Sequence, residues 1–180
     1  MNSYLETEGK KGQNDVTSLL LKYFNEHEIH SEKLVLISDG CSGQNKNYVM
    51  INFLYALVHI FELFQSIKYI FPIRRHTYLP NDQDFSLIGR LKKNGTVETD
   101  EEWNDIIKSA RKNPSPFEVK SVKHGMFHDT KRALEPYFLK QSKPAMHIKE
   151  VRMVKITKHS QFVYVKYNFT GGWTAINIRN

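Results

Sequence analysis

The chain has 180 residues, of which 40% are hydrophobic and 12% aromatic, so it can bury a core of one domain or slightly more and is not a disordered tail. Its 26 Lys and Arg residues outnumber 19 Asp and Glu residues, and the net charge of +7 favours an anionic partner, nucleic acid first. The basic residues are spread along the chain, however, as in an ordinary basic soluble protein. The single cysteine, Cys41, excludes an internal disulfide framework and a thiolate-rich zinc site, and it fits an intracellular protein.

The first half of the chain alternates predicted helices and strands. Residues 14–27 repeat apolar side chains at helical spacing, and Asn14 is of a type that caps helices. A short apolar strand is predicted over 34–38. A helix follows over 46–64, too short and too often interrupted by polar residues for a membrane span. A second strand is predicted over 66–73. This alternation predicts a sheet with parallel pairs.

The second half begins with a helix starting near residues 81–84 and changes in composition after it. Thr99-Asp100-Glu101-Glu102 forms a capping box for a helix that the run 113–116, Asn-Pro-Ser-Pro, terminates. The remaining predicted elements are a strand at 117–122, a helix at 130–139, and three strand-like segments at 148–157, 162–169 and 173–178. We therefore predict an α/β core over residues 1–95 and an α+β region over residues 96–180, packed on it.

The segment KLVLISDGCSGQNK, residues 33–46, places a carboxylate where the first strand ends. Asp39 should lie at the carboxyl edge of the sheet, where ligands usually bind in open α/β sheets. The loop after the second strand should emerge at the same edge, and it leads to Asp82 and Asp84. Converging carboxylates could hold Mg²⁺ or Mn²⁺, and two such ions support phosphodiester cleavage. Alternatively, Asp82 or Asp84 only caps the following helix.

Basic residues also lie close to the ends of these two predicted strands in the sequence. Lys46 stands near the first strand, and Arg74, Arg75 and His76 follow the second, so they could clamp phosphates; alternatively they belong to an ordinary basic loop. The loop at 40–46 could also bind phosphate at a helix amino end, although its spacing is not that of a Walker loop.

Other interpretations, mostly structural, remain open for several of these residues. The loop at 40–46 reads equally as a tight turn with glycines in unusual dihedral angles and Asn45 or Asn47 as a helix cap. A Cys41 nucleophile with His76 as its base has no fixed motif in its favour. The pairs His27 with His30 and His124 with His128 have ligand-like spacing, but they lack a Cys or carboxylate partner for zinc. The aromatic residues near the carboxyl end could stack on bases or could pack in the core; they are Tyr164, Tyr167 and Trp173.

Two longer segments, LVLISDGCSGQNKNYVMINFLYALV and IFPIRRHTYLPNDQDFSLI, resemble the catalytic core of transposon-derived DDE proteins with an RNase H-like fold. The chain is most similar to an uncharacterised, domain-of-unknown-function family with an SD-x-C-x-GQN-x-N motif and a later H-(T/S)-x-x-x-x-D-x-x-F motif, and the likeness extends through NPSPF to GGWT. The resemblance implies that Asp39 is the second acid of a DDE triad and Asp82, or less favourably Asp84, the third. It further implies that His76 belongs to the same constellation and that Asp39 and Asp82 bind Mg²⁺ or Mn²⁺.

The resemblance also implies an incomplete RNase H-like core. In that fold the first acid lies on a strand of a three-stranded ribbon before the first helix, whereas only the short opening segment 1–7 and a turn come before Asn14 here. We therefore expect an amino-truncated copy with an exposed sheet edge, which self-associates or needs a partner segment.

The expected function is that of a metal-dependent nuclease or strand-transferase-like domain acting on DNA, inactive alone. The alternative is a non-catalytic nucleic-acid- or protein-binding relic of a transposable element. We expect no membrane association, and an intracellular location that is nuclear rather than cytoplasmic.

Overall fold

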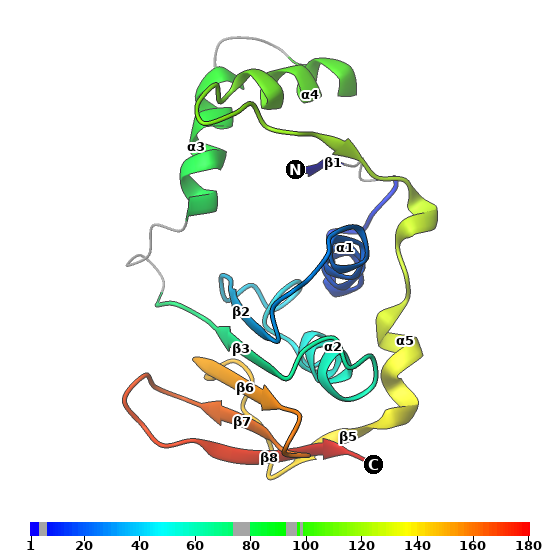
Figure 1. The fold of residues 1–180 in the computed structure, drawn as a ribbon, viewed down its shortest axis with the longest axis vertical. Coiled ribbons are helices and arrows are strands. Elements are labelled where there is room, and N and C mark those ends of the chain that lie inside the picture. The colour runs from blue at the N-terminus through cyan, green and yellow to red at the C-terminus, as the bar shows by residue number, and fades with distance from the viewer. Residues whose placement is uncertain (4–6, 74–79, 93–96, 98) are drawn as a thin grey trace. The chain divides into compact units, whose positions relative to one another are not determined.

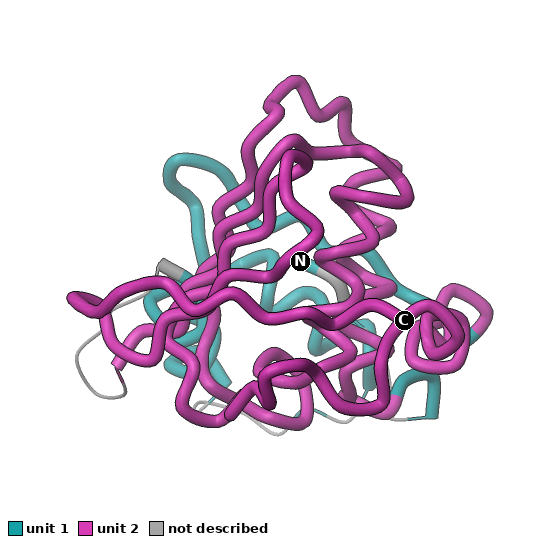
Figure 2. Tube along the Cα trace, turned by 90° about the horizontal axis from the view of Figure 1, so that it is seen from below, with its two compact units in different colours: residues 1–9, 75–124 teal, residues 10–74, 125–180 magenta. Residues whose placement is uncertain are grey.

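A computed structural model describes residues 1–3, 7–73, 80–92, 97 and 99–180. The chain divides into two compact units, drawn in different colours in Figure 2. Unit 1 combines Met1–Gly9 with Arg75–His124, and unit 2 combines Lys10–Arg74 with Gly125–Asn180. Each unit therefore takes residues from both sides of the predicted domain boundary at residue 95.

Unit 2 is built on a six-stranded sheet of order β2-β3-β6-β7-β8-β5 (Figure 1). Its strands are β2 (Lys33–Ile37), β3 (Ser66–Ile70), β5 (Phe138–Lys143), β6 (Met153–Thr157), β7 (Val163–Lys166) and β8 (Thr174–Arg179). Strands β2 and β3 are parallel, as the helix between them requires, and every other pair is antiparallel. The mixed α/β class is confirmed, and within the described sheet the predicted parallel pairing holds for β2 and β3 alone.

The core of unit 2 lies between this sheet and its helices, which are α1 (Gln13–Glu26), α2 (Tyr48–His59) and α5 (Thr130–Leu134). Helix α2 is apolar on nearly all sides, so it is buried: Ile51, Leu54 and Leu57 are each 0% exposed. It is shorter than the predicted 46–64. The chain leaves it near Glu62, whose φ of 52° is left-handed. Among the described helices, none has the length and apolarity to cross a bilayer.

Helix α1 is joined to the segment around α5 by side-chain hydrogen bonds. The predicted cap residue Asn14 is not the cap: the N-cap is Gly12, and Asn14 lies inside α1. Its amide instead donates to Asp129 Oδ1 at 2.9 Å and accepts from the Lys131 backbone at 3.1 Å. Thr17 continues the contact, with its hydroxyl 2.8 Å from that of Thr130. Asn14 therefore bonds to a segment that is distant in the sequence and does not cap its own helix.

Unit 1 contains α3 (Pro80–Lys92), α4 (Asp100–Ser109) and the paired two-residue strands β1 (Asn2–Ser3) and β4 (Lys120–Ser121). The capping box of α4 is confirmed, because the Thr99 hydroxyl accepts from Glu102 N and the Glu102 carboxylate accepts from Thr99 N, both at 3.2 Å. A small core of Ile88, Ile107 and Phe117 packs α3 against α4.

The predicted second half is confirmed in its helices α3 and α4 and in its last three strands, and it is wrong for the helix over 130–139. Strands β6, β7 and β8 lie almost entirely within the predicted segments, and their buried residues alternate as expected. The helix predicted over 130–139 stops at Leu134, and a short 3-10 helix, Glu135–Tyr137, leads into β5. Pro136 lies in that turn and has no N–H to continue an α-helix.

Candidate functional site

Asp39 follows the carboxyl end of β2, as predicted. The ladder with β3 runs one residue past Ile37, since Ser38 N donates to Ile70 O at 3.2 Å. The chain then turns, and the Asp39 side chain is exposed. Because β2 and β3 are parallel, the segment after β3 begins beside it at the same edge.

The Asp39 carboxylate is held by its own loop. Its Oδ1 accepts from Asn45 Nδ2 at 2.7 Å and from Cys41 N at 3.2 Å. The turn is closed by the Cys41 carbonyl, which accepts from Asn45 N at 2.8 Å and from Lys46 N at 2.9 Å. Neither Gly40 nor Gly43 has a positive φ, so the predicted use of glycine for unusual dihedral angles is wrong.

Asn47 is the cap of α2, one of the two predicted candidates. Its Oδ1 accepts from Met50 N at 2.9 Å. Its Nδ2 donates to the carbonyls of Ser42 and Gln44, each at 3.1 Å. One asparagine thus fixes both the start of the helix and the loop that carries Asp39.

Tyr69 of β3 joins the neighbouring strand to this loop. Its hydroxyl lies 2.6 Å from Ser38 Oγ and donates to the Asn45 carbonyl at 3.2 Å. Burial raises the pKa of Tyr69 to about 12; the nearby Asp39 charge also raises it, and the Ser38 hydrogen bond acts in the opposite direction. The hydroxyl therefore stays protonated at neutral pH and keeps both hydrogen bonds.

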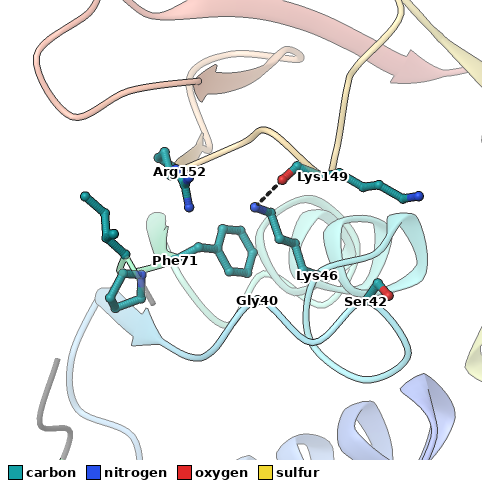
Figure 3. Close-up of a pocket in the computed structure, with 8 residues that line it drawn as sticks. Gly40, Ser42, Lys46, Phe71, Lys149 and Arg152 are labelled. Carbon is teal, nitrogen blue, oxygen red and sulfur yellow. Dashed lines mark hydrogen bonds between the residues drawn. The ribbon is translucent and has the colours of Figure 1, made fainter. Parts of the chain in front are cut away.

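Lys46 places a buried cation beside the same edge. Its side chain is only 5% exposed, and its Nζ donates to the Lys149 carbonyl at 2.7 Å. The ammonium also lies 5.1 Å from the centroid of the Phe71 ring, a cation–π contact that Figure 3 shows. Burying an ammonium is costly unless it is paired, so these contacts fix where its positive charge lies.

A pocket of about 420 Å³ opens next to this lysine. It is lined by Gly40, Ser42, Lys46, Phe71, Pro72, Ile73, Lys149 and Arg152. In Figure 3 the side chain of Lys149 extends away from the Lys46 ammonium, while Arg152 is seen to the upper left of the Phe71 ring. The Arg152 backbone is fixed by two hydrogen bonds, from Phe71 N at 2.9 Å and to Lys166 O at 2.7 Å. Three lining residues are basic and none is acidic, so the pocket favours an anion.

Asp82 and Asp84 lie in unit 1, inside α3, rather than before it as caps. Asp82 is in the first turn, where a negative charge is favourable to the helix dipole. The Asp84 carboxylate lies 3.5 Å from Arg111, whose guanidinium stacks over the Phe117 ring at 4.0 Å. Asp39 belongs to unit 2, and its convergence with these two carboxylates of unit 1 stays a prediction.

Three of the predicted site residues lie outside the described residues: Arg74, Arg75 and His76. The predicted pairing of Cys41 with His76 is therefore not tested. Within the described ranges, no three His, Cys, Asp or Glu side chains gather as a metal site would require.

The sequence did not point to Phe71, Lys149 or Arg152 as site residues. The last two precede β6, and they reach the edge only because β6 runs antiparallel to β3. The one signal available beforehand is that His147, Lys149 and Arg152 stand at the beginning of the strand-like segment predicted over 148–157.

Comparison with known proteins gives one positive result. A family described as "Domain of unknown function (DUF7869)" matches residues 3–170. No curated protein and no solved structure matches the chain significantly. With nearly its whole length matched, the chain belongs to the DUF7869 family.

Proposed function

We propose that this protein is a DNA-binding domain of the transposase-derived, RNase H-like DDE type, which holds the phosphodiester backbone at the carboxyl edge of β2 and β3. The observation that carries the proposal is the basic pocket beside Asp39, with the Lys46 ammonium and Arg152 at its walls. Basic side chains at a fixed spacing are the usual partners of phosphate oxygens. The net charge of +7 supports the same partner at long range.

The chemistry proposed for this edge is metal-dependent nicking or strand transfer, with Mg²⁺ or Mn²⁺ as the ion. Two-metal cleavage needs several carboxylates around the ions. The described residues bring no such group together, so by themselves they do not fit the ions. We therefore derive no step through a metal, and we expect the isolated chain to bind DNA more readily than it cuts it.

Binding is tested with Arg152→Gln, which removes one pocket charge and keeps a side chain of similar length. Fluorescence anisotropy of a labelled duplex, measured across salt concentrations, should show weaker binding and a salt slope smaller by about 1. Arg132→Gln on α5 makes the same charge change away from the pocket and should bind like wild type. Equal loss in both variants would mean that only net charge matters and would refute the site.

Cleavage is tested by plasmid nicking with Mg²⁺ or Mn²⁺, comparing wild type with Asp39→Asn. Asparagine keeps an acceptor for Asn45 and Cys41 N, so the loop should stay folded. Nicking that Asp39→Asn abolishes would support the nuclease. Equal nicking by both proteins would rule out Asp39.

The second candidate is a non-catalytic nucleic-acid-binding relic. It is favoured by the scarcity of carboxylates just described together with a basic pocket that is intact. Salt-sensitive binding that depends on Arg152, with no nicking under any ion, would identify it.

A further inference from the structure

The sheet of unit 2 has a second face, opposite the one that packs against α2. Alternate residues of the central strands are buried against the helix; they include Ile67, Tyr69, Val154, Ile156, Val163, Val165 and Ile176. The residues between them point to the other face. There Val35 is 58% exposed, Ile37 is 51% exposed, and Lys68 and Ala175 are exposed as well.

The strand register places two lysines side by side on this face. Val35, Lys68, Lys155 and Tyr164 are direct cross-strand neighbours in turn, from β2 to β7. Lys68 and Lys155 therefore oppose each other on adjacent strands, about 5 Å apart at the backbone. Like charges directly opposite destabilise a sheet, and within the described chain neither lysine forms an ion pair. A bound anion would relieve this repulsion.

Two aromatic rings lie among these cations. The Lys155 ammonium is 5.4 Å from the Tyr164 ring centroid and 5.2 Å from that of Trp173, which precedes β8. The Lys166 ammonium lies 5.1 Å from the same Trp173 ring. Tyr164 is further fixed by Ser160, whose hydroxyl lies 3.0 Å from its own. Flat apolar surfaces thus alternate with positive charges.

Acidic side chains are missing from the strand positions of this face. On β2, β3, β6, β7 and β8 those positions hold Lys33, Val35, Ile37, Ser66, Lys68, Ile70, Met153, Lys155, Thr157, Tyr164, Lys166, Ala175, Asn177 and Arg179. A protein partner of ordinary composition would meet only one sign of charge here. A polyanion with planar, apolar groups matches both the lysines and the rings.

We infer that this face binds single-stranded nucleic acid, with bases against Trp173 and Tyr164 and phosphates at Lys68, Lys155 and Lys166. Single strands are bound in this way, by aromatic stacking combined with a positively charged track. Duplex bases are already stacked on each other and cannot use the rings, so the face should discriminate single strands from duplex. None of these contact residues lines the pocket, although the backbone of Lys166 accepts a hydrogen bond from that of Arg152, and the inference goes beyond the proposed function.

The chain offers a direct optical test, because it has two tryptophans, Trp103 and Trp173. Trp103→Phe leaves Trp173 as the sole indole. Titration with (dT)12 and with (rU)12 should quench the fluorescence of Trp173. The oligonucleotide that binds more tightly shows whether the face prefers DNA or RNA. Anisotropy of the labelled oligonucleotides should show affinity lowered at least about fivefold by Trp173→Ala, from lost stacking, and also lowered by Lys155→Gln.

Matched controls keep the test separate from folding and from the proposed function. Lys131→Gln and Tyr137→Ala alter an exposed lysine and an exposed tyrosine near α5 and should bind like wild type. Circular dichroism should show each variant folded. Arg152→Gln should weaken duplex binding only. A negative result for single strands therefore does not contradict the proposed duplex site, and a negative result for duplex does not contradict the inferred single-strand site. Wild-type affinity in Trp173→Ala, or single-strand binding lost only with Arg152→Gln, would overturn the inference. So would a dimer that Trp173→Ala dissociates while (dT)12 has no effect.

Discussion

Tyr69 illustrates how a single hydroxyl can determine the geometry of the candidate site. It joins β3 to the Asp39 loop through Ser38 and the Asn45 carbonyl, and it is 3% exposed. An unpaired hydroxyl at that depth would be costly, so its two partners are part of what keeps the loop in place.

Tyr69→Phe should lower the free energy of unfolding by about 1 kcal/mol at pH 7 through the lost hydrogen bonds. The pKa of Tyr69 is raised in the folded state to about 12, so the folded protein holds this proton more tightly than the unfolded chain. Its contribution is complete below about pH 10 and is lost as the pH rises toward 12. Urea unfolding at pH 7 and pH 11 should therefore show a smaller alkaline loss in the variant than in wild type. Tyr137→Phe, at an exposed tyrosine, is the control and should leave the alkaline loss unchanged.

His59 at the end of α2 has the opposite kind of shift. Burial lowers the pKa of His59, and the positive charges of Arg179 and Lys158 lower it further. Its ring stacks on Tyr55 at 4.1 Å, and its Nε2 has no hydrogen-bond partner among the described residues. Protonation is thus disfavoured in the folded state, because the charged ring would lie near two cations.

Acidification should expose this shift as a loss of stability. The folded pKa is below the unfolded value of about 6.5, so the unfolded chain binds the proton first and stability falls as the pH drops below 6.5. His59→Gln should flatten that part of the curve, measured as urea midpoints from pH 7.5 to pH 5. His30→Gln changes a histidine that is 81% exposed and should leave the slope unaltered. Parallel curves for wild type and His59→Gln would contradict the assignment.

At the scale of elements, the link between β2 and α2 depends on Asn47. Asn47→Ala removes the cap of α2 and two donors to loop carbonyls, and it should cost about 1 to 2 kcal/mol in urea unfolding. Asn47→Asp keeps the capping acceptor and loses the donors, so it should lie between wild type and the alanine variant. An aspartate variant as unstable as the alanine variant would mean that the loop, rather than the cap, depends on this residue.

The elements that the sequence predicted well are those whose signals are local. The capping box at Thr99, the strand that precedes Asp39 and the alternation in β6, β7 and β8 all depend on neighbours in the chain. Long-range contacts decided the rest. Asn14 has the composition of a cap but bonds to Asp129, and β5 exists because β8 is there to pair with it. The pocket could not be predicted either, because Arg152 enters it through the pairing of β6 with β3.

At the scale of the whole molecule, β2 is an edge strand, paired in the described sheet with β3 alone. On the face opposite α2, its side chains Val35 and Ile37 are more than half exposed, at 58% and 51%. Open edges with apolar side chains promote strand pairing between molecules. This agrees with the expectation of self-association, which remains a prediction.

Replacing both side chains by threonine should reduce that association, because threonine keeps the β-branched shape and loses apolar area. Sedimentation velocity over a range of concentrations should show less dimer or aggregate in Val35→Thr/Ile37→Thr than in wild type, with an unchanged circular dichroism spectrum. A matched change on the last strand, Ala175→Thr, is the control. If wild type is monomeric at every concentration, the edge is not an association site.

The sheet of unit 2 is assembled from two distant stretches of the chain, with residues 75–124 between them belonging to unit 1. A nascent chain that has emerged from the ribosome only as far as residue 124 carries β2 and β3, whereas β5, β6, β7 and β8 are still to come. During that interval the part of α2 that contacts β6 in the folded protein stays uncovered, and we expect this apolar surface to favour aggregation of the incomplete chain. We expect the time needed to synthesise the chain between α2 and β6 to set how long this exposure lasts.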